Sequence, residues 1–320
     1  MRFRKIIAVI AAAALGVSLC GCTSPEKSES SGKLKVIATI FPAYDFARQV
    51  FGDTADVKML LKPGQESHSY DPSAKDIVEI SGCDLFVYNG GESDQWVESV
   101  LKSAPEVETF RMTDAVSLLD EEVTEGMQNA GEHDHDEEEH EEEHEDEYDE
   151  HVWTSPDNAS AIVKALGKRA AELFPENADS LTANADCYAG KINELDAKFA
   201  ELLSGEERYF IFGDRFPLLY FFRHYGLNYY AAFPGCGSET EPSAQTMTFL
   251  LDKLRQPDSV PAVFCIELSS RRLGEVLAED SGLPVVEFHT CHNISADDLA
   301  AGETYVSLME RNYEVLSDIL

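Results

Sequence analysis

PENADSLTANADCYAGKINELDAKFAELLSG, residues 175–205, separates two stretches of the chain that share one pattern. Its apolar side chains recur every three or four positions, at Leu181, Ala185, Tyr188, Ile192, Leu195 and Phe199. This period places them on one face of an α-helix. Residues 175–205 therefore predict one long amphipathic helix between the two halves.

On each side of this helix, short apolar runs rich in β-branched and aromatic residues alternate with segments of helical spacing. The runs are KVIATI, VKMLL, DLFVYN and VETFRM before the helix, and RYFIFG, LNYYAAF, PAVFCIE and PVVEFH after it. Strands that alternate with helices predict a parallel sheet. We therefore predict an α/β fold of two lobes, residues 33–174 and 206–320, each with a short parallel sheet flanked by helices and joined by the helix 175–205.

The beginning of the chain has the features of a secretory leader. Three basic residues precede an apolar run, residues 6–19, that is too short for a comfortable membrane span. The tetrapeptide LCGC at its end resembles a lipobox, which implies cleavage before Cys22 and a lipid on that cysteine. We predict a signal peptide over 1–21, a polar tether over 22–32 and an extracytoplasmic protein anchored to the membrane by its lipid, at the cell surface or in a periplasm. The alternative is an uncleaved helical anchor.

The chain is strongly acidic, with a formal net charge of −35 at pH 7. Eighteen Asp and Glu side chains fall within residues 120–150, so much of the acidity is local. This charge argues against nucleic acid as a partner and favours cations as ligands. Of the seven cysteines, two belong to the leader and lipobox. The remaining odd number allows a disulfide and leaves at least one thiol unpaired.

Two histidines stand in loops whose sequences would hold an imidazole in place. His68 follows the strand VKMLL and a Pro-Gly turn, and the segment DPSAKD after it leads into a helix. Ligands collect where parallel strands end, so this loop is a candidate site, although a lone loop histidine is more often a surface group. His151 precedes an apolar Val-Trp pair and a helix that opens at Ser155, so we expect a buried or half-buried imidazole.

The segments around these histidines, PGQESHSYDPSAKDI and EHVWTSPDNA, resemble the two histidine motifs of the metal-binding receptors of bacterial ABC transporters for zinc or manganese. TIFPAYDFARQVFGD, CDLFVYNGGESDQWV and GETYVSLMERNYEVL are also similar to that family. The resemblance implies two α/β lobes bridged by one long helix, with the metal buried between them. It also implies that His68 and His151 are ligands, and that an ABC permease and its ATPase subunit are partners.

The second lobe departs from the family's pattern. Many members have a histidine where this chain has Gly213, with Asp214 beside it. The family's last ligand corresponds to His289 in VVEFHTCHNIS, with His292 close by. The resemblance thus implies the ligand set His68, His151, His289 and Asp214, with His292 or water as the alternative to Asp214. A purely structural role is the other alternative for Asp214, as a helix cap or in a salt bridge to Arg215 or Arg223.

Imidazole ligands favour zinc over manganese, which prefers six oxygen-rich positions, so we expect Zn²⁺ with Mn²⁺ as the alternative. In the family resembled, zinc receptors often carry a mobile acidic, histidine-rich insertion before the second ligand, where this chain has residues 120–150. We expect this loop to be disordered and to collect divalent cations weakly through its carboxylates and His133, His135, His140 and His144. The alternative is a solubilising loop with no part in transport.

Cys236 and Cys291 each follow a second-lobe strand, and we predict a disulfide between them; the alternative is a pair of thiolate ligands for copper. The function predicted is an extracytoplasmic, high-affinity zinc receptor, monomeric, that delivers its ion to an ABC importer. A manganese receptor and a metal-scavenging or adhesin lipoprotein are alternatives. A zinc hydrolase is disfavoured because the sequence has neither an HExxH nor a GxSxG motif.

Overall fold

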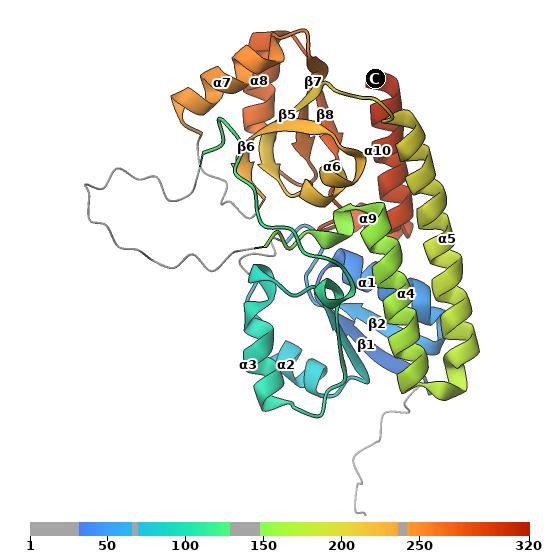
Figure 1. Ribbon diagram of the computed structural model, residues 1–320. Helices are drawn as coiled ribbons and strands as arrows, with labels where there is room; N and C mark the ends of the chain where they lie inside the picture. Colours follow the sequence, from blue (N-terminus) through green and yellow to red (C-terminus); the bar gives the residue numbers. More distant parts are fainter. Residues whose placement is uncertain (1–31, 66–69, 129–147, 236–241) are drawn as a thin grey trace, which may run out of the picture. The chain divides into compact units, whose positions relative to one another are not determined.

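The computed structural model describes residues 32–65, 70–128, 148–235 and 242–320 (Figure 1). Residues from Leu34 to Leu320 form one compact unit. It contains two four-stranded parallel sheets, with the strand orders β2-β1-β3-β4 and β6-β5-β7-β8. We call the parts built on them the first and second lobes. The predicted α/β fold is confirmed, and all eight predicted strands are present.

The first sheet is covered by helices on both faces. Its strands are β1 (Leu34–Ala38), β2 (Ala55–Met59), β3 (Leu85–Tyr88) and β4 (Thr109–Arg111), and the helices between them are α1 (Phe41–Phe51), α2 (Ala74–Ser81) and α3 (Gln95–Ser103). Because side chains alternate along a strand, Val36 and Val87 pack with α1 while Ile37 and Phe86 pack with α2 and α3 on the other face. Both faces are therefore apolar, as in other sheets of this class.

The second sheet repeats this arrangement. Its strands are β5 (Tyr209–Phe216), β6 (Asn228–Pro234), β7 (Ser259–Ile266) and β8 (Val285–Phe288). One face packs against α7 (Ala244–Leu254) and α8 (Arg272–Ser281) through residues such as Ile211 and Val263. The other packs against α6 (Leu219–Tyr225) and α10 (Tyr305–Ile319) through Phe212 and Phe288, and the short α9 (Ala296–Ala301) precedes α10.

The long helix between the lobes is present as α5 (Ala178–Leu202), 25 residues in length. It begins three residues later than predicted because Pro175–Asn177 form a short 3-10 turn. All six apolar residues of its predicted face are buried. α5 lies alongside α4 (Pro156–Leu173) and α10 (Figure 1). One hydrophobic core runs from the first sheet to the second along these helices. It does not divide the chain at residues 174 and 206, so the lobe boundaries at those residues stay a prediction. None of the described helices combines the length and apolarity that a membrane span needs.

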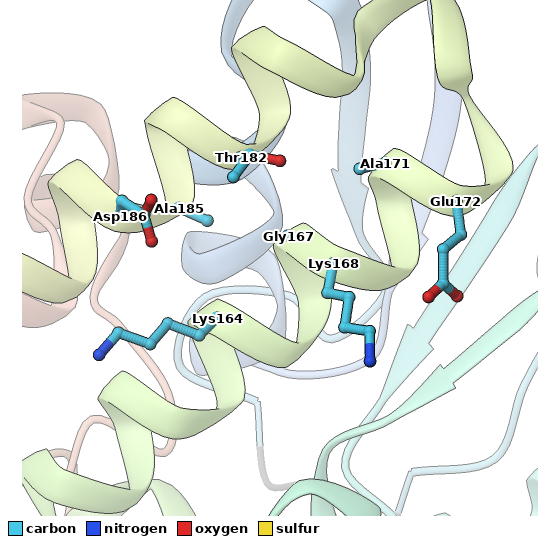
Figure 2. Close-up of a pocket in the computed structure, with 8 residues that line it drawn as sticks. All are labelled: Lys164, Gly167, Lys168, Ala171, Glu172, Thr182, Ala185 and Asp186. Atoms are coloured by element: carbon cyan, nitrogen blue, oxygen red, sulfur yellow. The ribbon is translucent and has the colours of Figure 1, made fainter.

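α4 approaches α5 closely at Gly167, which faces Ala185 (Figure 2). A Cβ atom at Gly167 would lie 2.3 Å from the Cβ of Ala185, whereas a Cβ at Gly190, also on α5, would meet no atom within 4 Å. Gly167 therefore sets the distance between the two helices, and Gly190 has no such role.

We expect Gly167→Ala to lower the free energy of unfolding by about 1–3 kcal/mol, because overpacking forces the two helices apart. Gly190→Ala is the matched control and should raise it by about 0.5–1 kcal/mol, because alanine favours the helix. Urea unfolding of the two variants, followed by circular dichroism, checks both signs. Equal effects would mean that helix propensity alone governs these positions.

Candidate metal centre

His151 is completely buried, as its apolar neighbours predicted. It follows an isolated antiparallel bridge between Asp120 and Tyr148 and precedes the 3-10 turn Val152–Thr154. Helix α4 then begins with a cap in which the Ser155 side chain accepts a hydrogen bond from the Asn158 N–H. The imidazole is thus fixed at the beginning of a long helix.

Asp149 orients this imidazole. One carboxylate oxygen, Oδ1, accepts the His151 backbone N–H at 2.7 Å and lies 3.0 Å from Nδ1. A carboxylate can only accept, so the Nδ1 proton points to Asp149 and Nε2 is the atom available to a metal. Burial, the largest effect, lowers the pKa of His151 and Arg215 also lowers it, but the charge and hydrogen bond of Asp149 together with the charge of Glu150 raise it above its usual value.

Glu150 is buried as well and is held by the NGGES segment that follows β3. Its Oε2 accepts the Ser93 N–H at 2.9 Å, its Oε1 accepts the Ser93 hydroxyl, and its carbonyl accepts the Asn89 side-chain N–H at 2.9 Å. Gly91, with φ of +114°, lets the chain pass closely, since a Cβ there would lie 2.6 Å from the Cβ of Glu150. The segment therefore positions the residue next to His151.

Asp94, which follows the NGGES segment, fixes the conformation of that segment. Its Oδ2 accepts the N–H groups of Asn89 at 2.9 Å and Gly90 at 3.0 Å. The pKa of Asp94 is raised to about 6, because burial and, to a smaller extent, the charge of Glu150 raise it more than the two backbone hydrogen bonds lower it. The buried carboxylate of Asp94 thus acts on that of Glu150, the residue next to His151.

From the second lobe, the structure brings His292 to His151. Their ring centroids are 5.2 Å apart, and the His292 ring also lies 5.1 Å from that of Trp153. Two imidazoles on one tetrahedral zinc ion, with Zn–N bonds of about 2.05 Å, have centroids roughly 5 Å apart. The spacing of these two rings therefore fits a shared zinc ion.

His289, which the resemblance favoured as the last ligand, is engaged locally. Its Nδ1 accepts the Cys291 N–H at 2.9 Å and lies 3.7 Å from a carboxylate oxygen of Glu267. Its backbone N–H donates to the side chain of Asn312 at 2.7 Å. The chain reverses between the two histidines, where Cys291 has φ of +59°. The ring that approaches His151 from the second lobe is therefore that of His292, which the resemblance offered only in place of Asp214, and the contacts of His289 are local.

Asp214 joins the ends of two second-lobe strands. Its Oδ1 accepts the Arg215 N–H at 2.9 Å and its Oδ2 accepts the Ile266 N–H at 3.3 Å; burial nevertheless raises its pKa. Arg223 pairs with Glu122 instead. These contacts favour a structural role for Asp214. Position 213 has no room for a histidine, because its Cβ would lie 2.7 Å from the Cα of Gly274 in α8.

Several predicted residues lie outside the described part of the chain: Cys22, His68, His133, His135, His140, His144 and Cys236. Cys291 is a completely buried free thiol, so the predicted disulfide with Cys236 finds no support in this structure, and burial raises its pKa well above the usual value. Within the described ranges, which omit His68, no three or more His, Cys, Asp or Glu side chains are grouped to hold a metal ion.

Glu267, at the end of β7, is a functional candidate that the motifs did not reveal. Its carboxylate accepts the Thr290 N–H and the Thr290 hydroxyl, both at 2.7 Å, and the His292 N–H at 3.2 Å. It is buried and holds the loop that carries His292. The signal available was its position, because Glu267 directly follows a parallel strand in the place where ligands collect.

Solved structures with this fold include the zinc-bound ZnuA-like domain of AdcA from Streptococcus pneumoniae. It has a TM-score of 0.73 and 28% identity, over 90% of this chain and 99% of that domain. The metal-dependent lipoprotein YcdH of Bacillus subtilis has a TM-score of 0.73 and 26% identity, over 90% of this chain and 100% of that one. The fold and the histidines from both lobes define the class of metal-binding solute receptors.

Residues 36–319 match the sequence profile of ZnuA, the periplasmic component A of the zinc-uptake complex. The chain belongs to this family. It is 30% identical over 314 residues to the zinc-binding lipoprotein AdcA of Streptococcus pneumoniae R6, which is 98% of this chain and 60% of AdcA's length. The high-affinity zinc uptake system protein ZnuA of Bacillus subtilis 168 is also 30% identical, over 98% of this chain and 96% of that protein.

We expect Asp94→Asn to stabilise the protein at pH 7.5 by on the order of 1–3 kcal/mol, because the amide keeps an acceptor oxygen and removes a buried charge. The folded-state pKa of Asp94 is about 6, above its usual 3.8, so the wild-type protein loses stability as pH rises through this range. The advantage of the variant should therefore be full above about pH 6 and vanish below about pH 4. Thermal unfolding at several pH values tests this; an advantage that is independent of pH would contradict it.

Proposed function

We propose that the chain is an extracytoplasmic zinc-binding receptor, not an enzyme, and that it delivers Zn²⁺ to an ABC permease coupled to its ATPase subunit. The observation that carries the proposal is the approach of His151 and His292 from different lobes, with ring centroids 5.2 Å apart. Zinc is the cargo named for AdcA and for ZnuA of Bacillus subtilis, whose sequences this chain resembles.

The proposed ligands are His68, His151 and His292. His68 rests on the sequence motif alone, and His292 replaces His289 because of the contacts of the two rings. The fourth position goes to Asp214 or to water. Nitrogen donors from three imidazoles favour zinc over manganese.

The surroundings of the site suit a divalent cation. Buried carboxylates of Asp149, Glu150 and Glu267 lie in the loops that carry the two described histidines. Removal of water strengthens the attraction between these charges and a cation. Binding then consists of capture by deprotonated imidazoles whose positions are already fixed, followed by release to the permease.

The remaining parts of the proposal rest on sequence. A lipid on Cys22 would anchor the receptor at the outer face of the membrane, and AdcA is itself described as a lipoprotein. The acidic loop with His133, His135, His140 and His144 would collect zinc weakly near the site. The protein would act as a monomer.

The first test is zinc affinity, measured by competition with a chelator of known affinity. His151→Ala and His292→Ala should each weaken binding by more than about 100-fold, since loss of even an outer partner costs 10–100-fold. His224→Ala is the matched control: His224 of α6 pairs with Asp196 of α5, away from the site, so the affinity should stay unchanged. Asp214→Ala then decides between Asp214 and water at the fourth position, and His289→Ala should leave the affinity unchanged if His292 is the ligand.

A chain without residues 130–146 should keep one tight zinc. If tight binding disappears with this segment and survives His151→Ala, the chain is an acidic metal-collecting protein and not a receptor of the proposed kind. Titration with Mn²⁺ under the same conditions decides between the two cargoes.

We expect Asp149→Ala to weaken zinc binding by about 10–100-fold, because it removes the group that holds the Nδ1 proton. Asp149→Asn should recover part of this loss, since its amide oxygen still accepts that proton. In the zinc-free protein, ¹⁵N NMR of the His151 ring should report the Nε2-deprotonated tautomer for the wild type and a mixture for Asp149→Ala. An unchanged tautomer together with unchanged affinity would remove Asp149 from the site.

A further inference from the structure

A tight turn follows β2 and precedes His68 in the sequence. The Gln65 N–H donates to the Lys62 carbonyl at 3.0 Å, and Gly64 has φ of +75°. Proline before a glycine of positive φ is the pattern of a type II turn. The turn Lys62–Gln65 therefore has a defined shape and ends three residues before a proposed ligand.

This turn is bonded to the second-lobe loop that carries His292. The two N–H groups of the Asn293 side chain donate to the carbonyls of Lys62 at 3.3 Å and Gln65 at 2.5 Å. The Gly64 N–H donates to the Ile294 carbonyl at 3.1 Å. We call these three hydrogen bonds the interlobe clasp.

Asn293 is suited to this role. It is 8% exposed, and its Oδ1 accepts the Ile294 N–H at 2.7 Å, so the amide uses its acceptor oxygen and both donor hydrogens. The side chain cannot rotate without losing these bonds. Asn293 also directly follows His292, so any movement of the clasp moves the backbone of that histidine.

We infer that Asn293 is a positioning residue that couples the turn before His68 to the loop of His292 and thereby sets the rate at which cargo leaves. This rests on the proposed function, since both histidines are proposed ligands. When the clasp is closed, the two loops hold a fixed distance. Release requires them to separate, and the three hydrogen bonds oppose that separation.

The clasp can be opened without unfolding the protein. Lys62, Gly64 and Gln65 are exposed, so water can replace Asn293 at the two carbonyls. The contacts of Glu267 with Thr290 and His292 do not involve Asn293 and remain in the variant. Asn293→Ala should therefore fold and bind zinc, with altered loops only.

The first experiment is amide hydrogen exchange of the zinc-free protein. Exchange at Gly64 should become about tenfold faster in Asn293→Ala and in Asn293→Asp, which keeps the size of the side chain but replaces its donors with an acceptor. Asn184→Ala is the control, because the Asn184 side chain donates to the Val50 carbonyl at 3.0 Å between α5 and α1, away from the clasp. Unchanged exchange at Gly64 in both Asn293 variants would overturn the coupling.

The second experiment is zinc dissociation, followed in a stopped-flow instrument with a chelator in excess. We expect release about tenfold faster for Asn293→Ala and unchanged for Asn184→Ala. Faster exchange at Gly64 with unchanged release would overturn the role in cargo release. A wild-type protein that binds no zinc would overturn the proposed function and the release step with it, while the exchange experiment would still decide the coupling.

Discussion

The hydrogen bond from the Trp153 indole to the Thr290 carbonyl, 2.9 Å long, is the interaction on which the site depends. Trp153 is completely buried two residues after His151, and Thr290 is two residues before His292. The Tyr305 hydroxyl donates to the backbone carbonyl of Trp153 at 2.9 Å, so the backbone that carries the indole is bonded to the first residue of α10. A buried donor that loses its partner costs about 1–3 kcal/mol, so each lobe holds the other's histidine in place.

The same constraint limits how the lobes move. Asp45 of α1 is completely buried and accepts the Tyr188 hydroxyl of α5 at 2.5 Å and the Tyr305 N–H of α10 at 2.9 Å. These helices belong to the core that crosses from the first sheet to the second. A wide hinge motion would break this core, so exchange of a bound ion falls to the loops. The Lys62–Gln65 turn can move away from Asn293 once only three hydrogen bonds, which are exposed or half-buried, are broken.

The fold was predictable because its signals are periodic. The eight strands were predictable as short apolar runs because both faces of each sheet are buried, and α5 was predictable from its three-to-four spacing because one face of that helix is buried. The approach of His292 to His151 was not predictable in this way, since the sequence favoured His289 as the last ligand and offered His292 only in place of Asp214. His289 and His292 both follow β8 within four residues, and the backbone of Cys291, with φ of +59°, decides which imidazole faces His151. The absence of a histidine at position 213 could not be explained from sequence, because it follows from the close approach of α8 to Gly213, a tertiary contact that no local pattern reveals.

Several buried carboxylates lie in the segments around His151 and His292, and hydrogen bonds hold them. Glu267 accepts three hydrogen bonds and Asp94 two from the backbone, yet the pKa of Asp94 is still raised to about 6 because burial outweighs these bonds. Hydrogen bonds thus hold Asp94 in place but leave the cost of its charge partly uncompensated. A divalent cation between His151 and His292 would interact favourably with this charge. Under the proposed function, this attraction would contribute to the free energy of zinc binding.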